Sequence, residues 1–208
     1  MNLPQPQLPR IHLIRHGETE WSLSGRHTSR TEIPLTSEGE DQARRLGEQL
    51  RHVEFSRVFT SPRLRARQTC ELAGFGPVAE VEAELREWDY GDYEGRTSAE
   101  IRAARVDWNL FVDGAAGGET PAQVFARAES FARHLHVMGG NILVFSHGHF
   151  LRVLAAAWAG FPVVQARRLG LDPGSLSILA FDHQRADSPI ISLWNDTSVS
   201  VPAHQPVH

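Results

Sequence analysis

The chain has 208 residues, 41% of them hydrophobic, and a formal net charge of −4 at pH 7. This size suits one domain, and we expect a single domain over residues 1–208 with an ordered core at about 10–196 between loose tails. The charge balance excludes a general attraction for nucleic acid or an anionic membrane, so any anion site has to be local.

The first ten residues contain three prolines and no apolar segment, unlike a secretion signal or a membrane span, and we expect a cytoplasmic protein. The longest apolar region, residues 153–164, is too short to cross a bilayer. The single cysteine, Cys70, excludes an internal disulfide and a cysteine-based metal cluster. Its place in a helical pattern indicates a packing role.

The first predicted element is a buried strand, because residues 11–14 form an apolar run. It is followed by Arg15, His16 and Gly17, at the carboxyl edge where open α/β sheets place their ligands. Arg15 offers a planar fork of donors, and His16 is a candidate nucleophile or proton carrier. A lone histidine in such a place is more often an ordinary hydrogen-bonded residue, so the rest of the chain has to support this interpretation.

Residues 18–35 lack periodicity, which predicts a long loop over the strand edge of the kind that often binds substrate. A helix is predicted next over residues 37–52, started by a capping box between Ser37 and Glu40. A strand at residues 57–60 follows it.

A second helix should begin directly after this strand. Ser61 and Pro62 supply a cap and a proline at the first helical position, which puts Arg63 in the first turn. The simplest interpretation of Arg65 and Arg67, farther along this helix, is that they point to solvent.

The stretch from residue 85 to residue 95 is acidic, aromatic and broken by glycines, and it follows a short predicted strand at residues 77–81. This composition predicts a loop dense in functional groups. Short helices are predicted after it, at residues 98–104 and 106–112.

The second half of the chain repeats the opening pattern. Residues 120–123 begin a helix with a cap, a proline and a capping box, and Gly139–Gly140 end it. A buried strand at residues 141–145 then leads into His147 and Gly148, followed by an apolar helix.

Two last strands, at residues 175–181 and 190–194, are predicted to form an antiparallel hairpin. The alternation of strands and helices predicts a three-layer α/β/α sandwich with a mostly parallel central sheet. Because the carboxyl ends of parallel strands point the same way, the side chains that follow them should meet in one crevice. These are Arg15, His16, Arg63 and His147.

Two guanidinium groups, two imidazoles and a helix start together suit a phosphate, although a carboxylate could use the same groups. Phosphoryl transfer needs placement, charge compensation and a nucleophile, and histidine can be that nucleophile. The leaving alkoxide needs a proton, for which Glu87 is our candidate because partial burial beside Trp88 and Tyr90 would raise its pKa. Four other acids compete for this role: Glu18, Asp89, Asp92 and Glu94.

His149 follows His147 at a spacing that can chelate a metal, but no cysteine or Asp-x-Asp partner accompanies the pair. We therefore expect no metal, no cofactor, and a structural or pocket-wall role for His149. Arg152, one helical turn farther on, is either another anion contact or a surface charge.

Taken together, the motifs resemble those of the histidine phosphatase superfamily, in the branch that includes the cofactor-dependent phosphoglycerate mutases. The resemblance covers nearly the whole chain. Its motifs are Leu13–Glu18 with Trp21, Ile33–Thr36 with Gly39, Thr60–Ala66, Leu85–Glu87 with Gly91 and Glu94–Gly95, Gly118–Thr120, and Ser146–Gly148.

The resemblance implies that His16 is the phosphorylated nucleophile and Glu87 the proton donor. It also implies that Arg15, Arg63 and His147 hold the phosphoryl group. Substrate contacts are expected from Ser22, Thr28, Tyr90 and the backbone of Gly148. Ser22 departs from the asparagine usual at its position, which puts one phosphate contact in doubt.

Within the superfamily, the motifs are most similar to those of sugar-phosphate phosphatases of the sedoheptulose-1,7-bisphosphatase type. The mutases carry a longer basic insertion before the second histidine motif, whereas residues 96–145 here are compact and have no lysine. We expect a metal-independent phosphatase that acts on small phosphorylated metabolites, sugar phosphates or bisphosphates, through phosphohistidine. The alternatives are a phosphoglycerate mutase and a non-catalytic phosphoester-binding module, and the oligomeric state, including a homodimer, stays open.

Overall fold

A six-stranded sheet forms the centre of the protein, and its strand order is β3-β2-β4-β1-β5-β6. The computed structural model describes residues 8–198, so most of the two predicted tails lies outside the described residues. Strands β1 to β4 pair in parallel, whereas β5 pairs antiparallel with both β1 and β6. The strands are β1 Arg10–Arg15, β2 Arg57–Thr60, β3 Glu80–Val81, β4 Asn141–Ser146, β5 Leu176–Phe181 and β6 Pro189–Asp196. This arrangement confirms the predicted mostly parallel sheet with a C-terminal hairpin.

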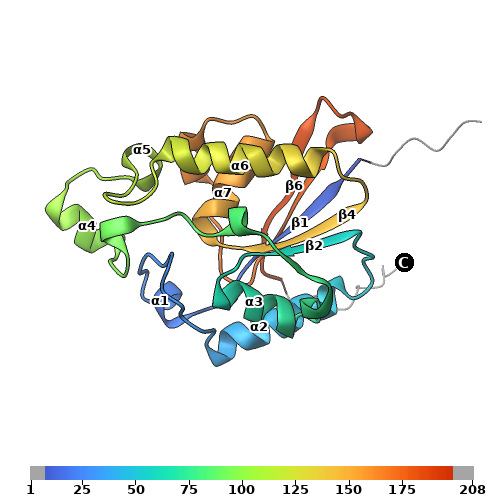
Figure 1. Ribbon diagram of the computed structural model, residues 1–208, viewed down its shortest axis with the longest axis horizontal. Coiled ribbons are helices and arrows are strands. Elements are labelled where there is room, and N and C mark those ends of the chain that lie inside the picture. Colours follow the sequence, from blue (N-terminus) through green and yellow to red (C-terminus); the bar gives the residue numbers. More distant parts are fainter. Residues whose placement is uncertain (1–7, 199–208) are drawn as a thin grey trace, which may run out of the picture.

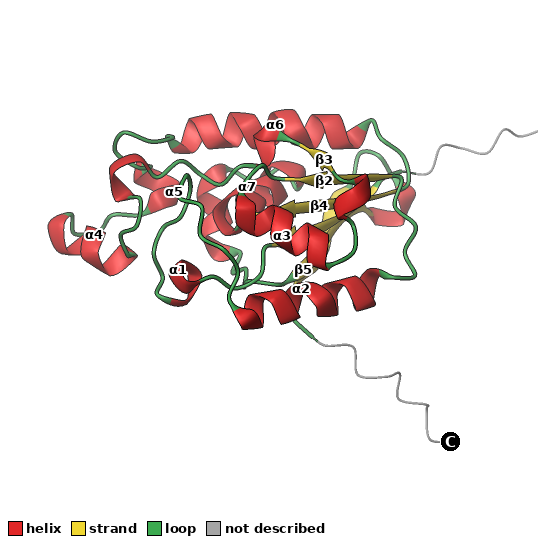
Figure 2. Cartoon of the chain, turned by 60° about the horizontal axis from the view of Figure 1, so that its bottom comes forward, coloured by secondary structure: helices red, strands yellow, loops and turns green. Residues whose placement is uncertain are grey.

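Helices cover both faces of the sheet and complete the three predicted layers (Figures 1 and 2). Helices α6 (Pro121–His136) and α7 (Gly148–Trp158) lie on one face, and α2 (Ser37–Leu50) and α3 (Leu64–Leu72) lie on the other. The short helices α1 (Glu20–Leu23), α4 (Ser98–Ala104) and α5 (Leu110–Asp113) lie together at one end, on the left in Figure 1. The carboxyl ends of the parallel strands point to this end. None of the helices in residues 8–198 has the length and apolar character needed to cross a membrane.

The alternation of side chains along β1 divides the core between the two faces. Ile11 and Leu13 belong to the apolar cluster that α6 and α7 cover, while Ile14 belongs to the cluster on the side of α2 and α3. Cys70 of α3 lies in this second cluster with 1% of its surface exposed, which confirms its packing role. Burial raises the pKa of its thiol to about 12.

Two helix starts differ from the sequence-based prediction. Thr36, not Ser37, caps α2, and its Oγ1 accepts a hydrogen bond of 3.1 Å from the Gly39 N–H. Helix α3 begins at Leu64, and Arg63 is its extended N-cap residue (φ −75°, ψ 140°) rather than part of its first turn. The predicted capping box of Thr120 and Gln123 is confirmed.

Two loops also differ from expectation. The segment 18–35 contains the one-turn helix α1, whose cap is Thr19. The helix predicted at residues 106–112 is reduced to α5, which begins at Leu110. Both segments are short and lack a full turn of apolar periodicity, so tertiary contacts decide their conformation.

Two glycines allow the start of α2 to pack closely against the loop that follows β1. A Cβ atom on Gly17 would lie 2.3 Å from the carbonyl oxygen of Gly39, and a Cβ atom on Gly39 would lie 2.2 Å from that of Glu18. Only residues without a side chain allow the two backbones to approach this closely. The contact fixes the backbone on the carboxyl side of His16.

Buried histidines make the stability of this fold sensitive to acid. Burial first, and then the charge of Arg10, lower the pKa of His12 in β1 to about 4. Burial also lowers the pKa of His27, in the loop after α1, to about 4. Below pH 6.5 these histidines bind protons in the unfolded chain but stay unprotonated in the folded chain. The free energy of unfolding therefore falls as the pH falls.

We predict that the free energy of unfolding falls between pH 6.5 and pH 4. Each such histidine contributes a slope of about 1.4 kcal/mol per pH unit in the middle of this window. His12→Gln should lower that slope by about one such contribution, because it removes one titrating group. Urea unfolding followed by circular dichroism at a series of pH values measures the slope. The exposed residue His183 provides the control, since His183→Gln should leave the slope unchanged, and equal slopes for the two variants would contradict the prediction.

Candidate active site

The carboxyl ends of three neighbouring strands lie side by side next to a cavity of about 210 Å³, which Arg15 and His16 line. His16 follows β1, His147 follows β4 and Ser61 follows β2. The rings of the two histidines lie edge to face, with their centroids 5.3 Å apart. The structure therefore brings together both histidines that the sequence singled out.

His16 is buried and presents one defined ring nitrogen. Its Nδ1 lies 2.8 Å from the carbonyl oxygen of Gly17, and because a carbonyl only accepts, Nδ1 carries the proton. Nε2 is then a bare acceptor, and Nε of Arg65 donates to it at 3.2 Å. Burial, and next the charges of Arg65 and Arg15, hold the pKa of His16 well below its ordinary value of 6.5. A neutral imidazole with its lone pair on Nε2 is the form a nucleophile needs.

The structure places Arg65 against His16, in the position expected for Arg63. Arg65 is 1% exposed, so its expected solvent position is wrong, and its Nη2 donates to the carbonyl oxygen of Thr28 at 2.8 Å. Arg63 is half-buried: its Nη1 lies 3.3 Å from a carboxylate oxygen of Glu32, and its buried Nε has no hydrogen-bond partner among residues 8–198. The prediction chose Arg63 because it placed this residue in the first turn of the helix. Helix α3 begins three residues after Ser61 instead, and with this start Arg65 rather than Arg63 faces β1.

A signal for Arg65 was present in the sequence. Arg65 and Thr69 are four residues apart, so they share one face of α3 next to the apolar stripe of the helix. Thr69 Oγ1 accepts from the Gly17 N–H at 3.0 Å and donates to the carbonyl of Arg65 at 2.7 Å. This face therefore contacts the residues around His16.

His147 and Arg15 complete the wall around His16. Nε2 of His147 is hydrogen-bonded to Ser61 Oγ at 2.7 Å, and its buried Nδ1 has no hydrogen-bond partner among residues 8–198. Burial, and then Arg65 and His16, hold the pKa of His147 well below 6.5. The Arg15 guanidinium donates to the carbonyl of Leu171 through Nη1, while its buried Nε likewise has no partner within the described chain.

Gly148 lets the start of α7 contact this wall. It is the first residue of α7, and a Cβ atom on it would lie 3.2 Å from Cζ of Arg15. The N–H groups of His149 and Phe150 donate to Glu87, which leaves the Gly148 N–H at this helix start. Such an N–H group and a guanidinium both attract anions. The pair therefore suits the oxygens of a bound phosphate.

The carboxylate of Glu87 sits at the same helix start. One of its oxygens accepts from the N–H groups of Trp88 at 2.9 Å and Phe150 at 2.8 Å, and the other accepts from that of His149 at 3.1 Å. Three backbone donors thus fix the carboxyl group at the edge of the cavity.

Arg127 of α6 holds the loop that carries Glu87. Its Nη1 donates to the carbonyl oxygens of Glu84 at 2.6 Å and Arg86 at 2.8 Å, and the guanidinium pairs with both carboxylate oxygens of Glu119. Cζ of Arg127 also lies 4.5 Å from the ring centre of Phe150. Sequence reasoning placed Glu119 in a motif but gave neither residue this role, because the clamp joins segments about 40 residues apart.

The expected substrate contacts Ser22, Thr28, Tyr90 and Gly148 all line the cavity. Ser22 uses its hydroxyl to donate to the carbonyl of Thr19 at 2.9 Å, so it also completes the cap of α1. The Tyr90 hydroxyl and His149 Nδ1 are 2.6 Å apart. Burial, and next the charge of Glu87, raise the pKa of Tyr90 well above 10, so its hydroxyl keeps its proton and donates to His149. His149 thus lies in the pocket wall.

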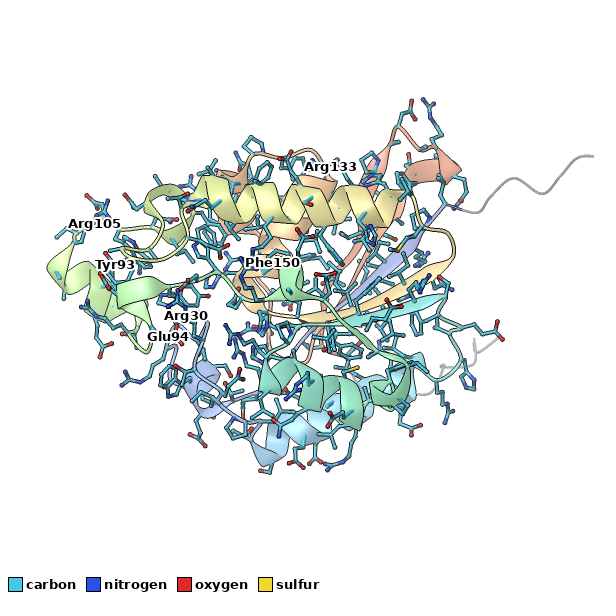
Figure 3. The ribbon with its side chains drawn as sticks, viewed as in Figure 1. Arg30, Tyr93, Glu94, Arg105, Arg133 and Phe150 are labelled. Atoms are coloured by element: carbon cyan, nitrogen blue, oxygen red, sulfur yellow. The ribbon has the colours of Figure 1, made fainter. Side chains whose placement is uncertain are left out.

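Two of the competing acids, Glu94 and Asp89, serve other contacts. Glu94 accepts from the N–H groups of Ser29, Arg30 and Thr31, and its place beside Arg30 is seen in Figure 3. Burial raises the pKa of Glu94, but these hydrogen bonds outweigh it and hold the pKa below its usual value. Asp89 pairs with Arg30, so Glu87 is the carboxylate that lines the cavity within the described chain.

Comparisons with known proteins identify the family of the chain. The model of the histidine phosphatase superfamily (branch 1) matches residues 11–197. An acid phosphatase of Mycobacterium tuberculosis is 41% identical over 84% of this chain and 87% of its own length. A sedoheptulose 1,7-bisphosphatase of Saccharomyces cerevisiae is 34% identical over 89% of this chain and 92% of its own. The solved structure of a protein encoded by a Mycobacterium tuberculosis open reading frame is 38% identical, with a TM-score of 0.84, and the match covers 91% of this chain and 98% of that one.

The three arginines around the start of α3 provide a direct test of this geometry. We predict that Arg65→Gln lowers kcat/KM for a phosphomonoester by about 10²–10³-fold, because a preorganised charged donor next to the reacting group is lost. Arg63→Gln should cost less than about tenfold, since Arg63 pairs with Glu32 and makes no hydrogen bond to His16. Arg67→Gln, on the exposed side of the same helix, is the matched control and should leave kcat/KM unchanged. A larger loss from Arg63→Gln than from Arg65→Gln would contradict the placement.

Proposed function

The chain belongs to the histidine phosphatase superfamily and is a phosphoric monoester hydrolase, and we propose that its substrates are sugar phosphates or bisphosphates, hydrolysed without a metal through a phosphohistidine intermediate. One observation carries the proposal: His16 is a buried neutral imidazole whose unprotonated Nε2 lies among the charges of Arg65 and Arg15. Such surroundings attract a phosphate dianion and leave the nucleophile ready for attack.

The proposed reaction has two steps. Nε2 of His16 attacks phosphorus in line, so a P–N bond forms while the bond to the sugar oxygen breaks, and Glu87 gives that oxygen its proton. Water then attacks phosphohistidine, Glu87 takes a proton from it, and inorganic phosphate leaves with His16 restored. Arg15, Arg65, His147 and the N–H of Gly148 hold the phosphoryl oxygens. When substrate binds, the Arg65 guanidinium gives up its hydrogen bond to Nε2 of His16 and donates to a phosphoryl oxygen instead.

The substrate class is supported by the size of the site and by the relatives. A cavity of about 210 Å³ suits the reacting end of a small metabolite rather than a folded protein. Two relatives of 41% and 34% identity are named as phosphatases, and the second is named for a sugar bisphosphate. We further propose that the chain acts as one domain in the cytoplasm.

A trapping experiment tests the nucleophile. With a ³²P-labelled sugar phosphate and an alkaline quench, the parent protein should show one acid-labile phosphoenzyme per chain, and His16→Ala should show none. Activity of His16→Ala near the parent level would refute the mechanism. Product analysis by ³¹P NMR separates the alternatives, because a phosphatase releases inorganic phosphate, a mutase releases an isomeric ester, and a binding module releases neither.

The role of Glu87 predicts a dependence on the leaving group. Glu87→Gln cannot give a proton, so kcat for a sugar phosphate should fall by about 10²–10⁴-fold. The loss should be at least tenfold smaller with p-nitrophenyl phosphate, because p-nitrophenolate leaves readily without a proton. Equal losses with the two substrates would mean that Glu87 only holds the start of α7.

A further inference from the structure

Ser61 lies beside His147 because their strands are neighbours in the sheet. Ser61 follows β2 and His147 follows β4. The N–H of Ser61 donates to the carbonyl oxygen of Phe145 at 2.9 Å, so the backbone pairing of the two strands continues to Ser61. Both side chains are fully buried. The sequence predicts that Ser61 caps α3, but this helix begins at Leu64 without a side-chain cap, and the Ser61 hydroxyl binds His147 instead.

The hydrogen bonds of the Ser61 hydroxyl decide which way it donates. Its Oγ lies 2.7 Å from Nε2 of His147 and accepts from the N–H of Arg63 at 3.3 Å, and within residues 8–198 it has no third partner. If Nε2 carried a proton, Oγ would accept twice, and its own buried proton would have no acceptor. A buried donor without an acceptor is costly. The hydroxyl therefore donates to Nε2, which is a bare acceptor.

The single proton of His147 is then located. Burial, and next the charges of Arg65 and His16, hold the pKa of His147 well below 6.5, so its ring is neutral. A neutral imidazole carries one proton, and the hydrogen bond that one nitrogen makes decides which nitrogen carries it. Because Nε2 accepts from Ser61, the proton lies on Nδ1. This buried N–H has no hydrogen-bond partner in the described part of the chain, so it is a donor in need of an acceptor.

From these contacts, and on the basis of the proposed function, we propose that Ser61 is a positioning residue: it places the proton of His147 on Nδ1, and this N–H donates to an oxygen of the phosphoryl group. Ser61 itself does not touch the substrate. An uncharged ring can donate there without adding a charge that Arg65 and Arg15 would repel.

The two histidines of the site thus have the same tautomer and use opposite nitrogens. Their rings lie edge to face, with centroids 5.3 Å apart, and both carry the proton on Nδ1. In the proposed reaction His16 attacks phosphorus with its bare Nε2. The bare Nε2 of His147 is covered by Ser61, so Nδ1–H is the group that His147 has left for the substrate. Without Ser61 nothing in the described structure would fix this choice.

The tautomer can be measured without turnover. In protein labelled with ¹⁵N-histidine at about pH 8, where imidazoles are neutral, ¹H–¹⁵N spectra distinguish a protonated from a bare ring nitrogen. His147→Gln identifies the signals of His147. We expect a protonated Nδ1 and a bare Nε2 in the parent, and a new population with protonated Nε2 in Ser61→Ala. A protonated Nε2 in the parent, or an unchanged tautomer in Ser61→Ala, would overturn the proposal.

Inorganic phosphate tests the donation to the phosphoryl group. Phosphate added to the labelled parent should shift the Nδ1–H signal of His147, because this N–H gains an acceptor. A signal that does not move when phosphate saturates the site would contradict the proposal.

Activity should follow the tautomer. Ser61→Ala should lower kcat/KM for p-nitrophenyl phosphate by about 10–100-fold, as when a partner that orients a site histidine is removed. Ser61→Thr keeps a hydroxyl donor and should recover both the tautomer and most of the activity. Ser177 of β5 is equally buried and accepts from the N–H of Asn195 at 3.0 Å, so Ser177→Ala is the matched control and should leave kcat/KM unchanged.

The spectra separate this proposal from the proposed function. If the parent shows protonated Nδ1 and the phosphate shift but hydrolyses no phosphoester, the proposed function fails and the role of Ser61 in placing the proton stands. If the parent hydrolyses phosphoesters while His147 carries its proton on Nε2, the reverse holds.

Discussion

The fold keeps one imidazole uncharged in the middle of a cluster of guanidinium groups, and the rest of the site depends on this constraint. Burial and the charges of Arg65 and Arg15 disfavour a proton on His16, and the hydrogen bond from Nδ1 to Gly17 decides which nitrogen is bare. The cations that repel a proton are also the groups that attract a phosphate dianion. One arrangement of charge thus prepares the nucleophile and binds its target.

Several parts of the fold maintain that arrangement. Because β1, β2 and β4 are parallel neighbours, the residues that follow them, His16, Ser61 and His147, lie at the same edge of the sheet. The close approach of Gly17 and Gly39 fixes the backbone beside the nucleophile. On the opposite wall, the hydrogen bonds of Arg127 join α6 to the loop of Glu87, and Glu87 in turn binds the start of α7. Direct hydrogen bonds therefore join the carboxylate of Glu87 to the start of α7.

Most of the fold could be predicted from the sequence, because long apolar strands and capped helices have strong local signals. The strand of residues 57–60 and the capping box at Thr120 were placed correctly for this reason. The choice between Arg63 and Arg65 failed because it depends on where α3 begins, and helix starts are decided by a few contacts at the cap. The contact of Arg127 with the loop of Glu87 could not be anticipated either, because it joins segments about 40 residues apart in the chain.

The position of Cys70 has a consequence for how this chemistry responds to oxidants. Peroxides react with thiolates, and the single sulfhydryl of the chain is buried in the apolar cluster between the sheet and the helices α2 and α3, with its pKa raised to about 12. The proposed nucleophile is an imidazole, which mild peroxide leaves intact. The single cysteine therefore offers such an oxidant no exposed thiolate.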